Sequence, residues 1–185
     1  RRKFIYFSAE LDMDKTLAPL RDNEKYRDWF TGVDISDKTV TDSQYSTAEE
    51  FFNAEVKMRI ETAEPGTCVV ADDAQDGALG LQEPMRKMII RLQRVGRHSR
   101  VGLMFLLHKI KSGLWTSQAM SSCRYIVLFP RSQKCKIRDF MEKELGMLRR
   151  DAKRAVKDFG QRSRAMIIRM HAPQCLISEK LIRLL

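Results

Sequence analysis

The chain has 185 residues, of which 43% are hydrophobic and 31% charged, and its formal net charge is +10. This length is typical of one domain with a hydrophobic core, and the composition excludes a wholly disordered chain. The longest strongly apolar run, Val101–Leu107, is far shorter than the roughly 20 residues of a membrane-spanning helix, so no membrane partner is expected.

The predicted elements begin with a strand at Lys3–Ser8, whose residues are β-branched and aromatic. Polar, turn-rich sequence follows. A capping box at Ser46 and Glu49 then opens a helix that runs to about Arg59. Thr67–Ala71 is a short apolar run that predicts a second strand.

A helix is expected from Pro84, after a Gly-rich loop, to Gly96, which would act as its C-terminal cap. Two continuous apolar runs follow, Val101–Leu107 and Arg124–Phe129. Such runs are typical of strands buried on both faces of a parallel sheet. The remaining predicted elements are helices at Ser132–Leu145 and Leu148–Phe159, with Gly160 as a stop, and a terminal hairpin at Ala165–Met170 and Cys175–Ser178.

Strands that alternate with helices indicate an α/β fold with a mostly parallel sheet flanked by helices. In such a sheet, ligands bind at the carboxyl ends of the strands. Three candidate groups follow predicted strand ends: Asp72 with Asp73, His108, and the polar stretch after Phe129.

Charge is distributed unevenly along the chain. Residues 1–80 carry 10 basic and 17 acidic side chains, a net of −7, whereas residues 81–185 carry 24 basic and 7 acidic, a net of +17. The basic part indicates an anionic partner, nucleic acid first. Nucleotide phosphates, an acidic protein or a merely solvated Arg-rich surface are the alternatives.

The acidic pair Asp72 and Asp73 follows four small or hydrophobic residues, which is a Walker-B-like signature. The first carboxylate can hold Mg²⁺, usually through water, and the second can orient or deprotonate the water that attacks a γ-phosphate. An acidic pair after a strand is also common in solvated turns and helix caps.

Three stretches carry a resemblance to a known family: CVVADD at 68–73, RVGRHSR at 94–100 and LMFLLH at 103–108. They resemble the FtsK/HerA-type P-loop ATPases, most closely the genome-packaging ATPases of large DNA viruses, virophages and polinton-like elements. In these proteins the Walker B strand is followed by a helix, a Gly-Arg-His stretch and a strand ending in a sensor residue, usually Gln. Stretches at 129–133 and 163–173 look like the viral branch.

The resemblance implies a single ATPase-like α/β domain over residues 1–185, with a P-loop ATPase-like (ASCE) sheet that is N-terminally truncated before its second strand. Its parts would be a variable acidic part at 1–65, a Walker B and sensor core at 66–130, and a basic part at 131–185 that ends in a β-hairpin.

The same resemblance implies roles for five residues. Asp72 would be the Mg²⁺ carboxylate, Asp73 the catalytic base and His108 the γ-phosphate sensor. Arg97 or Arg124 would complete the site of a neighbouring subunit. The plainer alternatives are a structural turn for Asp72, a cap for Asp73, a hydrogen-bonded strand-end residue for His108 and surface positions for both arginines.

Two features depart from the family pattern. His108 stands where Gln is usual, which would make phosphate sensing depend on pH. No G-x-x-x-x-G-K-[ST] phosphate loop (Walker A) occurs in the sequence, although in this family that loop precedes the strand equivalent to Lys3–Ser8. The resemblance therefore implies a fragment without the phosphate-loop strand, in which Val101–Leu107 and Arg124–Phe129 have unpaired inner edges.

The function implied is that of a viral DNA-packaging ATPase, a hydrolase that uses ATP and Mg²⁺ to move double-stranded DNA into a capsid or prohead. It would act as a homo-oligomeric ring inside the infected host cell, in a viral factory or the virion, and the present chain alone would be inactive. The alternative is a non-catalytic basic α/β module that binds nucleic acid. The basic helix residues that would line a DNA channel, or form a solvated face, are Arg86, Lys87, Arg91 and Arg94.

Overall fold

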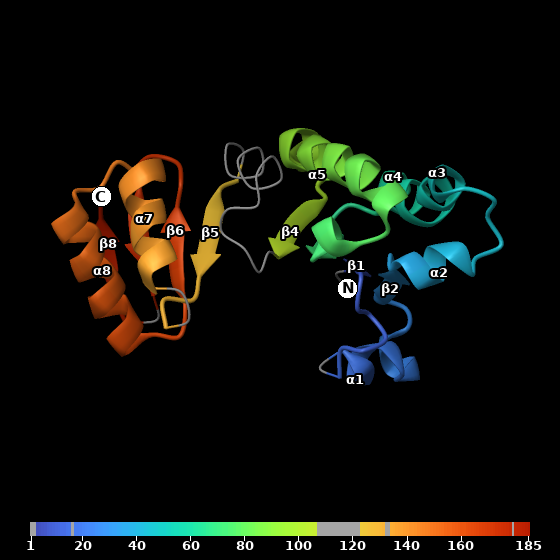
Figure 1. Ribbon diagram of the computed structural model, residues 1–185, viewed down its shortest axis with the longest axis horizontal. Helices are drawn as coiled ribbons and strands as arrows, with labels where there is room; N and C mark the ends of the chain where they lie inside the picture. The colour runs from blue at the N-terminus through green and yellow to red at the C-terminus, as the bar shows by residue number, and fades with distance from the viewer. Residues whose placement is uncertain (1–2, 16, 107–122, 132–133, 179) are drawn as a thin grey trace. The chain divides into compact units, whose positions relative to one another are not determined.

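The computed structural model describes residues 3–15, 17–106, 123–131, 134–178 and 180–185 (Figure 1). The chain divides into two compact units, Arg1–Lys109 and Ile110–Leu185. Each unit has a four-stranded sheet of its own. The one sheet expected from the sequence is therefore replaced by two, of which the first is parallel and the second antiparallel.

The sheet of the first unit has the strand order β2-β1-β3-β4, and all its strands are parallel. Its strands are β1 (Phe4–Ser8), β2 (Phe30–Asp34), β3 (Cys68–Asp72) and β4 (Gly102–Leu106). This confirms the predicted parallel α/β architecture and three of its strands. β2 lies where the sequence predicts only turns, because Gly32 interrupts its short apolar pattern. A Cβ atom at Gly32 would lie 2.9 Å from Leu11 Cδ2.

Helical segments connect these strands. They are α1 (Ala18–Arg21), η1 (Glu24–Tyr26), α2 (Asp37–Thr41), α3 (Ala48–Phe51), the π-helical η2 (Phe52–Lys57), α4 (Met58–Glu61), η3 (Ala74–Asp76) and α5 (Leu79–Ser99). The cap of α3 is Thr47, whose hydroxyl accepts the Glu50 N–H at 3.1 Å, while the Glu50 carboxylate accepts the Ser46 N–H at 2.9 Å. The N-cap thus lies one residue later than predicted, with Glu50 three residues after it, and the Glu50 carboxylate bonds the N–H before the cap residue.

Both predicted ends of α5 are wrong. The helix begins five residues before Pro84 and continues past Gly96 to Ser99, where Arg100 in the left-handed conformation (φ 56°) ends it. Gly96 is needed for a different reason than capping. The chain folds back so closely that a Cβ atom at Gly96 would lie 2.7 Å from the Val101 carbonyl oxygen, and the Val101 N–H donates to the Gly96 carbonyl at 2.9 Å.

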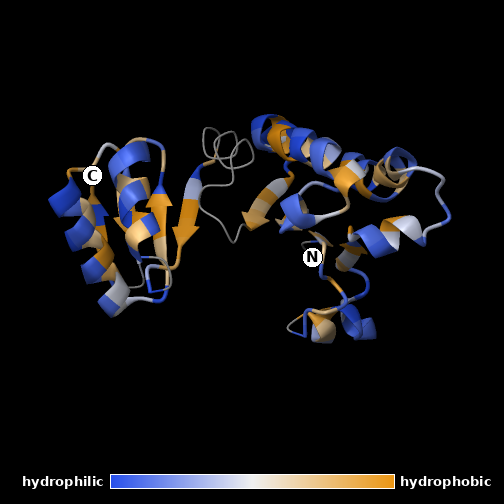
Figure 2. Cartoon of the chain, viewed as in Figure 1, coloured by the Kyte–Doolittle hydropathy of each residue, from blue (hydrophilic) through white to orange (hydrophobic). Residues whose placement is uncertain are grey.

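Strand β4 is the edge strand of this sheet, because β3 is its one neighbour among the described residues. Met104 is paired in register with the buried Val70, yet it is 52% exposed, and Leu106 is 38% exposed. The prediction that this strand is buried on both faces is therefore wrong for the described structure. Figure 2 shows β4 as a hydrophobic strand, which is an unusual composition for an open edge.

The second unit has an antiparallel sheet with the strand order β5-β6-β7-β8, and two helices pack on it. Its elements are β5 (Tyr125–Leu128), α7 (Lys134–Glu144), α8 (Arg149–Arg162), β6 (Met166–Arg169), β7 (Cys175–Ile177) and β8 (Ile182–Leu184). The predicted terminal hairpin is confirmed as β6 and β7. The parallel pairing expected for Arg124–Phe129 is wrong, since β5 pairs antiparallel with β6. Gly160 does not stop α8, which continues to Arg162.

The core of the second unit lies between the sheet and its helices, with Phe140, Phe159 and Ile168 at its centre. The opposite face of the sheet is also apolar. Val127, Ile167, Ile177 and Ile182 are neighbours in register across all four strands, and Val127 and Ile182 are 51% and 69% exposed. One face of this sheet is thus covered by α7 and α8, whereas the other presents apolar side chains.

Candidate functional site

The carboxyl ends of the strands in the first sheet form a row of residues in register. Asp34, Ser8, Asp72 and Leu106 follow one another across β2, β1, β3 and β4. Asp73 comes directly after Asp72. Since ligands of parallel α/β sheets bind at this edge, the row is the candidate site, and the structure brings Asp72 and Asp73 to it as predicted.

Two polar residues of this row stabilise the local turns. The Asp34 carboxylate accepts the Ser36 N–H at 2.8 Å, and the Ser36 hydroxyl caps α2 by accepting the Thr39 N–H at 3.3 Å. The Ser8 hydroxyl accepts the Glu10 N–H at 3.1 Å. These side chains therefore hold the loops that follow β1 and β2, which shapes the edge around Asp72.

Asp72 has a partner that the sequence does not indicate. The hydroxyl group of Tyr6, in the neighbouring strand β1, donates a hydrogen bond of 2.5 Å to Asp72 Oδ2. Burial of the phenol raises the pKa of Tyr6 above its ordinary value of 10.0. The hydrogen bond to Asp72 and the negative charges of Asp72, Asp14 and Asp73 raise this pKa further. Tyr6 therefore remains a neutral donor that holds one oxygen of the Asp72 carboxylate in place.

Asp73 has an uncommon backbone conformation. Its φ of 46° and ψ of 33° lie in the left-handed region, which Asp and Asn tolerate better than most residues. Its N–H donates to the Leu106 carbonyl at 3.4 Å, and its carbonyl accepts the Asp76 N–H at 2.7 Å. Both ends of the residue are thus anchored. Asp73 is half-buried as a residue, and its Oδ1 atom is buried. Conformations of this kind are common at functional sites.

The Tyr6–Asp72 hydrogen bond gives a testable contribution to stability. Tyr6→Phe removes the donor and is expected to lower the free energy of unfolding by about 1–3 kcal/mol at pH 8, as for other hydrogen bonds to charged groups. The raised pKa of Tyr6 gives this effect a pH dependence. Below pH 10 the stability contributed by Tyr6 is fully present. Above pH 10 the phenol is deprotonated in the unfolded chain but stays protonated in the folded chain, so the wild type loses stability as the pH rises.

Urea unfolding of wild type and Tyr6→Phe at pH 8 and pH 11 measures both effects. The difference in the free energy of unfolding between the two proteins should be smaller at pH 11 than at pH 8. An equal difference at both pH values would contradict this account. Tyr125→Phe is the control, because the 57% exposed Tyr125 lies in the second unit and its replacement should change stability little.

Of the other predicted catalytic residues, Arg97 belongs to the same unit as Asp72 and Asp73 but does not join them. Arg97 is exposed in the last turn of α5, which leads to the amino end of β4. A helix that connects parallel strands returns the chain to the opposite end of the sheet, so Arg97 lies away from the acidic pair. Arg124 precedes β5 in the antiparallel sheet of the second unit. His108 lies outside the described residues.

The basic residues of α5 that were predicted to bind DNA are largely engaged in ion pairs. Arg86 lies 2.6 Å from Glu83, Lys87 lies 3.6 Å from the same carboxylate, and Arg91 lies 3.2 Å from Glu61. Such pairs are typical of a solvated helix face. Their partners offset part of the positive charge that α5 presents, whereas Arg94 is exposed and has no ion pair among the described residues. DNA binding by this face stays a prediction.

The residues at the acidic pair fit an Mg²⁺ ion only with a nucleotide. Among the described residues, no group of three or more His, Cys, Asp or Glu side chains is arranged to hold a metal ion. Sites for Mg²⁺ of the nucleotide-dependent kind need one or two carboxylates, with the other ligands coming from water and phosphates. Asp72, oriented by Tyr6, meets that smaller requirement.

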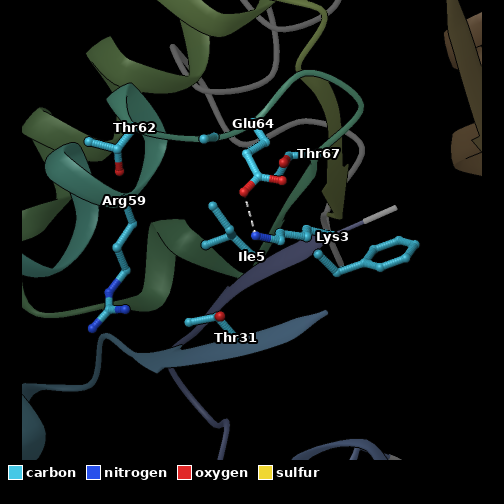
Figure 3. Close-up of a pocket in the computed structure, with 9 residues that line it drawn as sticks. Lys3, Ile5, Thr31, Arg59, Thr62, Glu64 and Thr67 are labelled. Atoms are coloured by element: carbon cyan, nitrogen blue, oxygen red, sulfur yellow. Dashed lines mark hydrogen bonds and ion pairs between the residues drawn. The ribbon is translucent and has the colours of Figure 1, made fainter. Parts of the chain in front are cut away.

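A hollow of about 190 Å³ lies at the other end of the sheet, near the start of β1 (Figure 3). Lys3 and Glu64 form an ion pair of 2.7 Å beside it, and Thr31, Arg59 and Thr67 line it. It is therefore separate from the acidic pair, which follows the carboxyl end of β3.

No family model, curated protein or solved structure matches this chain. None of the helices among the described residues combines the length and apolar character that crossing a membrane requires. The candidate site is consequently defined by the strand-end geometry of Asp72 and Asp73.

Proposed function

We propose that this chain is the Walker B portion of a P-loop ATPase of the FtsK/HerA type. The observation that carries the proposal is the position of Asp72 and Asp73 at the carboxyl end of β3, an interior strand with parallel neighbours on both sides. The intact protein would use ATP hydrolysis to translocate double-stranded DNA into a viral capsid, as a ring of subunits in the virion or viral factory.

The two carboxylates would divide the chemistry between them. Asp72 would hold Mg²⁺ through water, and the ion would offset the charge that develops on the nucleotide phosphates. Asp73 would orient the attacking water and accept its proton. Tyr6 would fix the Asp72 carboxylate, and a low-mobility carboxylate favours a defined metal position.

The exposed edge of β4 supports the proposal that a further strand pairs with it in the intact protein. Met104 and Leu106 present apolar surface at the edge of the described sheet, although parallel strands of this composition are normally interior. A further strand that carries the phosphate loop would pair here and cover that edge. It would come from outside the 185 residues, which contain no G-x-x-x-x-G-K-[ST] sequence. Because Arg97 is remote from Asp73 in its own chain, its proposed role in trans requires a neighbouring subunit.

A non-catalytic nucleic-acid-binding module is the second candidate. The observation that favours it is the Tyr6–Asp72 hydrogen bond, because a carboxylate held by a buried phenol also suits a purely structural role. The net charge of +17 over residues 81–185 serves this function equally well.

Calorimetric titration with Mg·ATP separates the two candidates. The 185-residue chain alone should show no micromolar binding, because a phosphate loop supplies the backbone N–H groups and lysine that hold the β- and γ-phosphates. The chain extended upstream by its own coding sequence, about 30 residues with a strand and loop, should bind and hydrolyse ATP. Micromolar binding by the monomeric short chain would contradict the proposed sheet order. If the extended chain contains no Gly-Lys-Ser/Thr loop and does not bind Mg·ATP, the result would favour the non-catalytic module.

A further inference from the structure

We infer that the outer face of α8 is the surface that binds the phosphate backbone of double-stranded nucleic acid. Among the side chains that the structure describes, five cationic ones are exposed on this 14-residue helix, and they share one face. They are Arg149, Arg150, Lys153, Arg154 and Lys157. The inference rests on the nucleic-acid partner of the proposed function, but not on ATP hydrolysis.

The opposite side of α8 holds the helix on its unit. Ala152, Ala155, Val156 and Phe159 are buried in the core between the helices and the sheet. The helix is therefore a rigid support, with one face in the core and one in solvent (Figure 2). A charged row on such an element is held at constant spacing, which a row on a loop is not.

The charges of this face are less compensated than those of α5. Arg150 and Arg154 each lie 3.8 Å from an aspartate of the same helix, which is at the limit of an ion pair. Arg149, Lys153 and Lys157 have no ion pair within the part of the chain that the structure describes. These three stand at i, i+4 and i+8, where like charges destabilise a helix. An anionic ligand along the row would relieve that repulsion.

The dimensions of the row suit a duplex. At 1.5 Å per helical residue, about 12 Å separates the ends of the row from Arg149 to Lys157. Duplex DNA carries one negative charge per about 1.7 Å of its axis, so several phosphates lie within reach of the three side chains. Binding of single strands usually adds aromatic side chains that stack on bases, and α8 exposes none.

Two other anionic partners fit this face less well. Helices that bind membrane surfaces insert apolar side chains beside their cations, whereas the apolar residues of α8 are buried in its own unit. Protein interfaces are depleted in lysine and centre on aromatic anchors, which the exposed face of α8 lacks. A face of Lys and Arg alone is typical of contacts to phosphates without base readout.

Fluorescence anisotropy with a labelled duplex, at several salt concentrations, tests the inference on the 185-residue chain. The test variant combines Arg149→Gln, Lys153→Gln and Lys157→Gln. The matched variant combines Arg86→Gln, Lys87→Gln and Arg91→Gln on α5, with the same change of charge. Gln is a good helix former, so circular dichroism should show both variants folded.

The α8 variant should bind the duplex about ten- to a hundredfold more weakly, and its slope of log K against log salt should fall by about 2.7, at about 0.9 per phosphate contact. The α5 variant should remain within about threefold of wild type, and so should wild type on a duplex of different sequence. If the α8 variant keeps the affinity and salt slope of the wild type, the inference about α8 is overturned while the proposed DNA partner is not. If wild type binds no duplex, the proposed DNA partner fails with it.

Two competitors identify the other possible partners. Vesicles that contain anionic phospholipid and poly-glutamate should each compete at least tenfold less well than unlabelled duplex, per unit charge, because their charges lack the spacing of a duplex backbone. Competition by either one that equals that of the duplex would overturn the inference, in favour of a membrane surface or an acidic protein respectively.

Discussion

Replacing Asp73 by Asn is expected, under the proposed function, to reduce ATP turnover by about 10²–10⁴-fold in a chain extended by the proposed phosphate loop, because the amide cannot accept a proton from the attacking water. Binding of Mg·ATP should change little, since under the proposed function a phosphate loop and Asp72 would supply the binding contacts. The left-handed backbone at this position suits Asn as well as Asp, so the fold should be retained. Steady-state phosphate release measures turnover, and calorimetry measures binding.

Asp76→Asn is the matched control for this experiment. Asp76 lies three residues further on, in η3, and its side chain is exposed. The same chemical change there should leave turnover near the wild-type value. Near-normal phosphate release by the Asp73→Asn protein would exclude Asp73 as the base, and equal losses in both variants would indicate a general effect of charge at this edge.

Phe140→Ala is expected to lower the free energy of unfolding of the second unit by about 3–5 kcal/mol, the usual range for a buried Phe. Phe140 is completely buried in the core between α7, α8 and the sheet. Domains are commonly stable by only about 5–15 kcal/mol, so this loss would leave the unit marginally folded. Urea titration with hydrogen exchange of the α7 and α8 amides reports on this unit specifically.

Phe129→Ala makes the same substitution in the same unit at a residue that is 58% exposed. Its effect should stay below about 1 kcal/mol, as for most substitutions away from a core. Equal destabilisation by the two substitutions would contradict the core described for the second unit.

Hydrophobic patterning identified most of the strands correctly but not their pairing. Val101–Leu107 and Arg124–Phe129 have similar apolar composition, yet β4 pairs parallel with β3 and β5 pairs antiparallel with β6. A short apolar run has the same appearance in either arrangement. The pairing of a strand depends on which distant segments of the chain pack against it. The residues that surround the strand in the sequence do not contain that information.

Local signals for helix ends failed where tertiary contacts overrode them. Pro and Gly commonly mark the beginning and the end of a helix, but α5 extends beyond both Pro84 and Gly96. Gly96 serves the close approach of the Val101 carbonyl in the turn that follows the left-handed Arg100. The prediction of α7 and α8 succeeded because their apolar faces recur with the helical period and contact one core.

The sequence by itself determined the acidic pair after an apolar strand, the basic character of the second part of the chain and the alternation of strands with helices. These depend on residue type and on spacing over a few positions. Only the tertiary structure decided that Tyr6 holds Asp72, because the parallel register of β1 and β3 joins residues 66 positions apart. It also decided that Arg86, Lys87 and Arg91 of α5 have carboxylate partners within 3.6 Å, whereas Arg149, Lys153 and Lys157 of α8 have no ion pair among the described residues.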